Sequence, residues 1–313
     1  MPLRPGLRKA FITLARVACA GLLLYGAGSQ IVAEVKKLPG QEFRLHLPLL
    51  FAGAAWYAVA MAYFAAYWCQ VARSMGGSPG LLETQGAYFA SQLGKYIPGK
   101  AWVFFIRCAL IDGRKTPVSV IVASTFYETL AMMAAGASLA FAVLLSVGSA
   151  TPAMLLLSGG LAVGLVCAVW PPLFWRLAHW AARSFRKAGA TPVTPVTCRT
   201  WLRGLRYLVP GWAAAGISLL SVAGSLGVFA FGFRQFLLAC GSMALAIVGG
   251  FAVLIVPAGL GVREWVLMRT LGPDVGTGNA VLVAILTRIT HVSVELLVAS
   301  CLYLFRNRIN ENH

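Results

Sequence analysis

The segment that decides the fold is Gly94–Trp102, with the sequence GKYIPGKAW, which leads on to Arg107. Pro98 has no backbone donor and Gly99 leaves the backbone unrestrained, so the segment predicts a broken helix. The break lies in a strongly apolar chain, yet two lysines and an arginine surround it. Because cationic side chains are costly at membrane depth, a broken helix that carries them indicates a substrate site.

A second segment of the same kind is Pro257–Trp265, with the sequence PAGLGVREW, and Arg269 follows it. Both segments carry proline and glycine at the tip, then tryptophan, arginine and leucine, and finally an apolar span. Such internal similarity is typical of transporters whose substrate site lies between two repeats. The sequence therefore predicts two broken helical hairpins in corresponding places.

Composition places the chain in a membrane. Of its 313 residues, 59% are hydrophobic and 11% are charged, whereas soluble domains carry about 25% charged residues. The 26 basic residues outnumber the 9 acidic ones and flank apolar runs, which favours contact with anionic lipid over nucleic-acid binding. The seven cysteines and four histidines show no metal-ligand spacing, so neither a metal nor another cofactor is expected.

Apolar windows predict an all-α polytopic membrane protein, with residues 1–313 forming a single transmembrane domain. Two stretches fit an ordinary span poorly, because 82–112 is too polar and 236–272 is apolar only as far as Val256. About six full spans are expected, at 10–32, 48–71, 117–147, 151–171, 208–231 and 280–305.

Basic clusters predict the orientation. The N-terminus, residues 172–207 and the C-terminal tail are rich in arginine and lysine, so all three are expected in the cytoplasm. This topology requires that both polar stretches are re-entrant hairpins, which makes 48–147 and 208–305 the two units of an inverted repeat. Residues 236–256 are also long enough to cross the bilayer fully, and the sequence leaves that alternative open.

Two basic regions refine this topology. Arg4, Arg8 and Lys9 precede the apolar run 10–32, which we interpret as a retained first span and not as a cleaved signal peptide. Residues 172–207 are expected to begin with a basic amphipathic helix on the cytoplasmic leaflet. Two Thr-Pro pairs then predict an irregular linker between the two units.

Charged side chains near the first break suggest its chemistry. Lys95, Lys100 and Arg107 could form a cationic pocket for a phosphate head group, or an interfacial set that reaches toward water without a ligand. Glu128 is expected near mid-bilayer, where a carboxylate needs a cationic partner. The candidate partners are Arg107, Arg263 and Arg288, and the pairing could be structural or could couple transport to protons or substrate.

The second unit carries further charges. Arg263 and Glu264 are adjacent and need different partners, and Arg263 beside the glycine-rich break is the expected ligand contact. Arg288, His291 and Glu295 are spaced i, i+3 and i+7, which places them on one face of a helix. They fit either a proton relay or a polar seam between helices.

Together, the segment from Gly94 to Arg107, the membrane Glu128 and the motif Pro257–Glu264 resemble the transmembrane region of lysylphosphatidylglycerol synthases, a family also called flippase-like domain proteins. The resemblance covers nearly the whole chain. It implies a multi-pass protein of the bacterial inner (plasma) membrane that moves aminoacylated, polyprenyl-linked or hopanoid-type lipids. The sequence contains no soluble synthase domain, so aminoacyl transfer is not expected. A basic residue usually follows the glutamate in this family, whereas Thr129 follows Glu128 here.

The expected function is translocation of an anionic phospho- or polyprenyl-linked lipid, with both termini in the cytoplasm. The alternatives are a membrane-embedded transferase that acts on a lipid phosphate, and a non-transporting scaffold for a lipid-modifying enzyme. No catalytic motif is found, so an enzyme is not favoured. The helix-break residues are Pro98, Gly99, Pro257, Gly259 and Gly261. The expected substrate-binding residues are Lys95, Tyr96, Lys100, Trp102, Arg107, Glu128, Arg263, Glu264 and Arg288.

Overall fold

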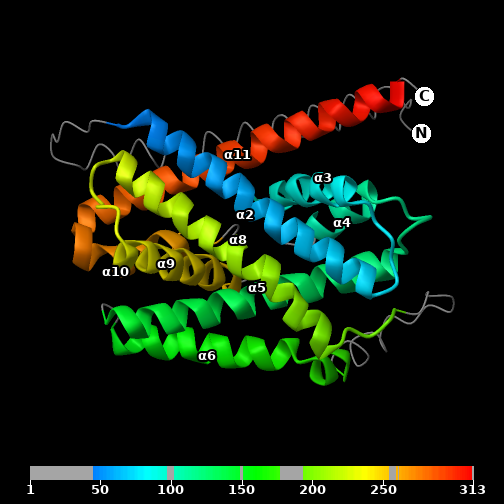
Figure 1. Cartoon of the computed structure of the whole chain (residues 1–313), viewed down its shortest axis with the longest axis horizontal. Coiled ribbons are helices and arrows are strands. Elements are labelled where there is room, and N and C mark those ends of the chain that lie inside the picture. The colour runs from blue at the N-terminus through cyan, green and yellow to red at the C-terminus, as the bar shows by residue number, and fades with distance from the viewer. Residues whose placement is uncertain are drawn as a thin grey trace, which may run out of the picture. The chain divides into compact units, whose positions relative to one another are not determined.

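The computed structural model describes residues 45–96, 102–148, 151–176, 193–253, 259 and 261–311. The chain divides into two units, Met1–Phe43 and Arg44–His313, and every described residue lies in the second. The predicted span 10–32 and most of the predicted amphipathic helix lie outside the described residues. All regular structure in the described ranges is helical (Figure 1).

Six of the helices in the described ranges are long and apolar enough to cross a membrane. They confirm a multi-pass α-helical membrane protein and match the predicted spans 48–71, 117–147, 151–171 and 280–305. The six are α2 (Leu47–Ser74), α5 (Val118–Val147), α6 (Pro152–Val169), α8 (Cys198–Ser225), α9 (Phe233–Ala252) and the part of α11 (Thr277–Glu311) that ends at Cys301.

Helix α8 begins earlier than the predicted span 208–231 and ends sooner. The hydroxyl of Thr197 accepts a hydrogen bond from the backbone N–H of Thr200 at 3.3 Å, which caps the helix before its basic first turns. The residues from Cys198 to Tyr207 are therefore helical and do not belong to the linker that the sequence predicts. Pro210 is accommodated inside the helix.

The first hairpin consists of α3 (Leu81–Gln92), the 3-10 turn η1 (Leu93–Tyr96) and α4 (Trp102–Leu110), and α3 packs against α4. The two ends of this hairpin meet, because the backbone N–H of Ser78 donates to the carbonyl of Lys115 at 3.1 Å. The carboxylate of Glu83 also accepts from the backbone N–H of Asp112 at 2.6 Å. Regular structure thus stops and resumes on either side of Pro98 and Gly99, which lie outside the described residues.

The second hairpin consists of α9 and α10 (Val262–Val275), which pack against each other. Its ends also meet, because the guanidinium of Arg234 donates to the carboxylate of Asp274 at 3.0 Å. Helix α9 has 20 residues, enough to cross about 30 Å of bilayer. The predicted break is found between the helices, where Gly259 and Gly261 have φ of 67° and 78°. These left-handed conformations favour glycine.

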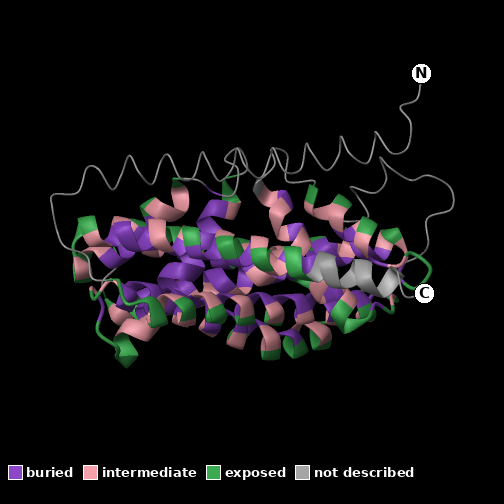
Figure 2. Ribbon diagram, turned by 90° about the horizontal axis from the view of Figure 1, so that it is seen from above, coloured by how far each residue is buried: buried purple, intermediate pink, exposed green. Residues whose placement is uncertain are grey.

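Helices α2 and α8 form the centre of the fold and pack closely along each other (Figure 1). A Cβ at Gly204 or Gly211 would lie within 3 Å of the ring of Tyr67 or Phe64, so glycine lets the two helices approach. Close van der Waals contact of this kind drives helix association in a membrane. Buried residues accordingly gather along the middle of the bundle, and exposed ones lie on its outer faces (Figure 2).

The packing of the helices has an internal correspondence. If α2, α3, α4 and α5 are exchanged with α8, α9, α10 and α11, the substantial contacts among these helices map onto one another. For example, α3 packs against α11 and α9 packs against α5, so each hairpin contacts the last helix of the other set of four helices. Helix α6 lies outside this correspondence and packs against α5.

Candidate functional site

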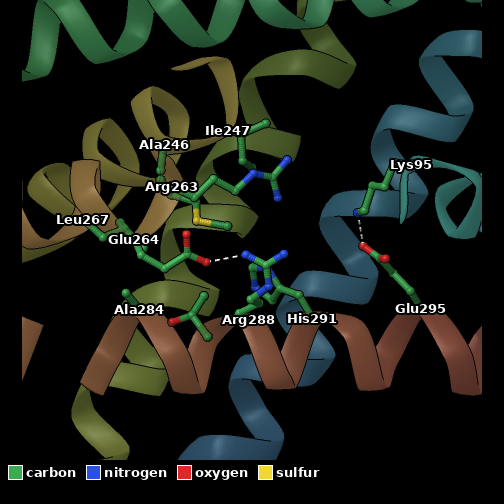
Figure 3. A pocket seen from close by; sticks show the side chains of 12 residues that line it. Lys95, Ala246, Ile247, Arg263, Glu264, Leu267, Ala284, Arg288, His291 and Glu295 are labelled. Atoms are coloured by element: carbon green, nitrogen blue, oxygen red, sulfur yellow. Dashed lines mark hydrogen bonds and ion pairs between the residues drawn. The ribbon is translucent and has the colours of Figure 1, made fainter. Parts of the chain in front are cut away.

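A polar cavity lies between α9, α10 and α11, with η1 closing one side (Figure 3). The space in it that a water-sized group can occupy is about 30 Å³, well below the volume of a pocket for a drug-sized ligand. Its wall is apolar where α9 contributes Met243, Ala246 and Ile247. The polar lining residues are Lys95, Arg263, Glu264, Thr287, Arg288, His291 and Glu295.

One ion pair in the cavity joins α10 to α11. The guanidinium of Arg288 donates to the carboxylate of Glu264. The other oxygen of Glu264 accepts from the backbone N–H of Gly261 at 2.7 Å, so this carboxylate also caps the start of α10. Glu264 therefore fixes the second break against the last span.

A second ion pair joins the first hairpin to α11. The amine of Lys95, at the end of the first hairpin's 3-10 turn, donates to Oε1 of Glu295 on α11 at 2.5 Å. The hydroxyl of Tyr57 on α2 donates to the same oxygen. The Glu295 side chain is 0% exposed, whereas the Lys95 side chain is 18% exposed. The carboxylate is thus enclosed, while the amine borders the cavity.

His291 is held in place from two sides. Its ring stacks on the ring of Tyr57, with centroids 3.6 Å apart and 6° between the planes. Its Nε2 lies 3.2 Å from the hydroxyl of Ser218, which donates to the carbonyl of Gly53 at 2.7 Å. Since the Ser218 proton is used in that bond, the hydroxyl oxygen accepts from Nε2, which makes Nε2–H the fitting tautomer.

Arg263 differs from the other cations of the cavity. It has no acidic partner among the described residues, and its Nε is buried without a hydrogen-bond partner in the same ranges. Its guanidinium extends from α10 into the cavity, toward the side where Lys95 and Glu295 lie (Figure 3). Gly250 leaves room for it, since a Cβ there would lie 2.9 Å from Cγ of Arg263.

A second polar atom of the cavity is also unsatisfied. Thr287 is 3% exposed, and its hydroxyl has no hydrogen-bond partner among the described residues. Buried polar groups are normally hydrogen-bonded, so each exception calls for an explanation. Two such groups, one a cationic donor and one a hydroxyl, line the same cavity.

The described lining residues do not balance in charge. Lys95, Arg263 and Arg288 face two carboxylates, those of Glu264 and Glu295. Among these described residues the basic side chains outnumber the acidic ones by one, and Arg263 is the one without an acidic partner in the described ranges. In a site of low dielectric constant such an excess attracts an anion strongly. The geometry can therefore hold one anionic group between Arg263 and Thr287.

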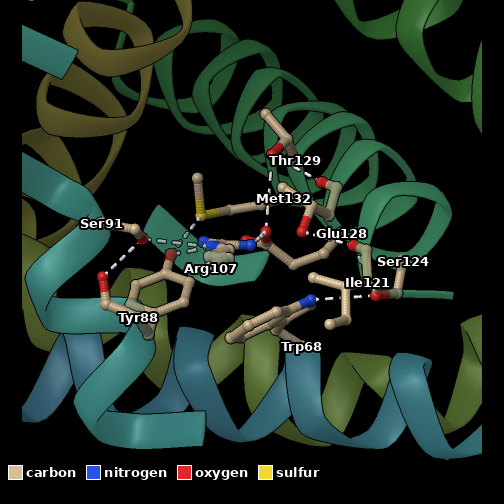
Figure 4. A network of polar contacts seen from close by, with 10 residues as sticks. Trp68, Tyr88, Ser91, Arg107, Ile121, Ser124, Glu128, Thr129 and Met132 are labelled. Atoms are coloured by element: carbon tan, nitrogen blue, oxygen red, sulfur yellow. Dashed lines mark hydrogen bonds and ion pairs between the residues drawn. The ribbon is translucent and has the colours of Figure 1, made fainter. Parts of the chain in front are cut away.

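Arg107 lies in a separate, closed network (Figure 4). Its Nη1 donates to Oε2 of Glu128 at 2.9 Å, and its Nε donates to the hydroxyl of Ser91 at 3.1 Å. The guanidinium also stacks over the rings of Trp68 and Tyr88, at 4.2 and 4.6 Å from their centroids. Arg107 is one of the three partners that the sequence proposes for Glu128, and the two side chains are 2% and 1% exposed.

Of the three residues from which the sequence predicts a cationic pocket, the structure places Lys95 and Arg107 apart, and Lys100 lies outside the described residues. Lys95 lines the cavity, whereas Arg107 does not, because α4 folds back against α3 and α5 and carries Arg107 into the interior. Trp102 is also absent from the cavity lining, and its ring makes an edge-to-face contact with Phe105. The described residues do not include Lys100, Pro98, Gly99, Pro257 or the side chain of Tyr96.

The remaining expectations meet in the cavity. Arg263, Glu264 and Arg288 line it, and the predicted polar face of Arg288, His291 and Glu295 points into it. Sequence analysis missed Tyr57, Ser218 and Thr287, because single hydroxyl groups in apolar helices carry no signal of their own. No group of three or more His, Cys, Asp or Glu side chains within the described ranges could hold a metal ion.

Comparison with known proteins does not extend this picture. No protein-family model and no curated protein matches the chain. What the fold and the site define is a multi-pass α-helical membrane protein with a cationic cavity between its helices.

Proposed function

We propose that the protein is a lipid translocase that binds an anionic head group in the cavity while the hydrocarbon tails stay in the bilayer. The observation that carries the proposal is Arg263, a cavity-facing guanidinium without an acidic partner among the described residues. A guanidinium can engage two oxygens of a phosphate at once. Thr287 supplies a hydroxyl for a further phosphate oxygen.

The other cations have a supporting role in this proposal. Lys95 and Arg288 already have carboxylate partners, so their charges are neutralised before a head group arrives. They can then turn toward a bound phosphate without leaving an unpaired cation behind when it departs. This assignment of the substrate contacts differs from the one expected from the sequence, in which Arg107 and Glu128 contact the substrate.

Re-entrant hairpins support a transport path. Both hairpins begin and end at one place, as the Ser78–Lys115 and Arg234–Asp274 contacts indicate. We propose that each enters the membrane and returns to the same side, α9 included, despite its length. Irregular backbone at membrane depth is tolerated where it lines a polar cavity, and the first turn of α10, directly after the break, lines the cavity with Arg263 and Glu264.

We propose that α2–α5 and α8–α11 form an inverted repeat. The exchange of α2–α5 with α8–α11 preserves the packing pattern, and it also relates two ion pairs. In the first unit Arg107 on α4 pairs with Glu128 on α5, and in the second Glu264 on α10 pairs with Arg288 on α11, with the signs reversed. One pair is enclosed and the other borders the cavity. Such a difference in exposure between the two ion pairs is expected if one unit rocks against the other and exposes the site to alternate sides of the membrane.

The proposal includes a plasma-membrane location with both termini in the cytoplasm. The basic first turns of α8, with Arg199, Arg203 and Arg206, favour a cytoplasmic start for that helix. The resemblance to flippase-like membrane proteins agrees with this orientation and with a lipid substrate. It rests on sequence motifs alone.

A reconstituted flipping assay tests the proposal. Vesicles that contain the protein and a fluorescent phosphatidylglycerol are treated with a membrane-impermeant quencher, and the rate at which lipid reaches the outer leaflet is measured. We expect Arg263→Ala to abolish protein-dependent flipping, whereas Arg269→Ala, on the same helix but outside the cavity, retains it. Equal rates for wild type and Arg263→Ala would refute the site, and a lipid product of altered mass would favour the transferase.

A further inference from the structure

His291 is a buried side chain of the cavity that the proposed function does not use. It lies on α11, is 7% exposed, and lines the cavity. Its ring stacks on Tyr57 of α2, and its Nε2 lies 3.2 Å from the hydroxyl of Ser218 on α8. Two helices other than its own therefore fix the plane of the ring and the direction of its nitrogen atoms.

The hydrogen bonds of Ser218 decide which ring nitrogen carries the proton. The hydroxyl of Ser218 donates to the carbonyl of Gly53 at 2.7 Å, so its oxygen accepts from Nε2–H of His291. Neither of the residues that hold the ring is acidic, and a buried imidazolium without an acidic contact is costly. The ring is therefore neutral, with its proton on Nε2 and a lone pair on Nδ1.

Nδ1 of His291 is a hydrogen-bond acceptor that opens to the cavity. No hydrogen bond reaches it within the described ranges, and it is not among the buried polar atoms of those ranges that lack a partner. Since the ring lines the cavity, Nδ1 is exposed there. The guanidinium of Arg263 and the hydroxyl of Thr287, by contrast, can both donate. The cavity thus offers donors for an anion and a separate acceptor for a second group of the same ligand.

We propose that Nδ1 of His291 selects an anionic lipid whose head group carries a hydroxyl next to the phosphate. This inference rests on the proposed function, in which Arg263 and Thr287 hold the phosphate. Thr287 and His291 are four residues apart on α11, and side chains spaced in this way lie about 5–6 Å apart on one helix face. The short carbon chain of a polyol phosphodiester spans that distance, so the phosphate binds at Thr287 while the hydroxyl donates to Nδ1.

The charges of the lining decide between the two kinds of donor that phospholipid head groups carry. An ammonium group could also donate to Nδ1. Lys95, Arg263 and Arg288 line the same cavity, however, and outnumber its described carboxylates. A hydroxyl adds no positive charge beside them. The site therefore favours a polyol head group over an ethanolamine or aminoacylated one, and the aminoacylated lipids are among those that the sequence resemblance implies.

The size of the cavity agrees with a small head group. Its space of about 30 Å³ has room for about two water-sized groups. One phosphate oxygen and one hydroxyl fill this space, whereas a head group as large as a sugar ring would need the cavity to widen. A compact polyol such as glycerol therefore binds with the least rearrangement.

Titration of the full-length protein in detergent with three dioctanoyl lipids tests the inference. Phosphatidylglycerol and phosphatidylmethanol are both singly charged phosphodiesters, but only the first carries hydroxyl groups on its head. Phosphatidylethanolamine carries an ammonium group instead. We expect wild type to bind phosphatidylglycerol about fivefold more tightly than phosphatidylmethanol, which corresponds to one neutral hydrogen bond, and to bind phosphatidylethanolamine most weakly.

Two histidine variants identify the acceptor. His291→Phe keeps a ring that can stack on Tyr57 but removes Nδ1, so it should bind phosphatidylglycerol only as tightly as phosphatidylmethanol. His46→Phe, the matched control at the exposed start of α2, should keep the preference of about fivefold. If His291→Phe does not fold, nitrogen NMR of wild type with labelled histidine decides. Phosphatidylglycerol, but not phosphatidylmethanol, should shift the signal of one unprotonated Nδ1.

The outcomes separate this inference from the proposed function. Equal affinity of wild type for phosphatidylglycerol and phosphatidylmethanol, or a preference that survives in His291→Phe, would overturn the role of His291 and leave the translocase intact. Tightest binding of phosphatidylethanolamine would overturn that role as well. Absence of binding by all three lipids would overturn the proposed function and this inference together. If glycerophosphoglycerol, the same head group without tails, binds as tightly as phosphatidylglycerol, the site takes a water-soluble phosphodiester and the translocase is overturned.

Discussion

The closed network around Arg107 gives the sharpest prediction about stability. In this network Arg107 donates to Glu128 and Ser91 and stacks on Trp68 and Tyr88. Arg107→Met keeps much of the side-chain volume but leaves a carboxylate that is 1% exposed without its cation. Removing one partner of a buried pair costs about 3–5 kcal/mol of unfolding free energy. Glu128→Leu should lower the unfolding free energy by a similar amount, because it leaves the buried guanidinium without its carboxylate.

The double variant distinguishes this network from a substrate site. Arg107→Met with Glu128→Leu removes both charges, so no buried ion is left alone. The remaining loss is the stacking on two aromatic rings, about 2 kcal/mol. We therefore expect the double variant to be more stable than either single variant, by about 2 kcal/mol.

The assay is unfolding in mixed detergent micelles, followed by helical circular dichroism. The exposed pair Arg234–Asp274 is the matched control, and its coupling should stay below about 1 kcal/mol. Strictly additive effects of the Arg107 and Glu128 substitutions would refute the structural role. So would an Arg107→Met protein of unchanged stability that no longer binds lipid, because that result would return Arg107 to the substrate site.

Three further predictions follow from the cavity and the hairpins. Gly250→Ala should push the Arg263 side chain aside, since the new Cβ would lie 2.9 Å from its Cγ. We expect lipid affinity, measured by titration, to fall about tenfold. Unchanged affinity would contradict the placement of Arg263. Thr287→Val keeps the shape but removes the unsatisfied hydroxyl, so unfolding should be unaffected or slightly harder while lipid binding weakens by about 1 kcal/mol. Single cysteines introduced at Ser78 and Arg114, at the two ends of the first hairpin, should both react with a membrane-impermeant thiol reagent from one side of the membrane. Cysteines at Gln235 and Asp274, at the two ends of the second hairpin, should both react from the other side. Reaction of the Ser78 and Arg114 cysteines from opposite sides would rule out a re-entrant first hairpin.

Local sequence signals predicted much of the helical layout. Apolar windows located four of the spans because membrane length requires a long continuous run, and the glycines after α9 marked its break because their positive φ is costly for other residues. The predicted start of the span that α8 forms, at residue 208, was too late. The arginines at positions 199, 203 and 206 were assigned to a loop, whereas Thr197 caps a helix that contains them.

The site could be predicted only in part, because partners are fixed by tertiary packing. The polar face of Arg288, His291 and Glu295 follows from helical spacing, and the structure places all three in the cavity. Lys95 and Arg107 are close in sequence, yet the fold of the first hairpin sends one to the cavity and the other to Glu128. No spacing rule indicates that Lys95 meets Glu295, which is 200 residues away.

Native mass spectrometry of gently purified protein tests the central claim most directly, because it asks whether the cationic cavity holds an anionic lipid. Wild type, Arg263→Ala and the control Arg269→Ala are released from the same detergent, and the masses of retained lipids are compared. We predict an anionic lipid on wild type and on Arg269→Ala that is lost from Arg263→Ala. Retention of the same lipid by Arg263→Ala, or bulk lipid alone on all three proteins, would contradict the account.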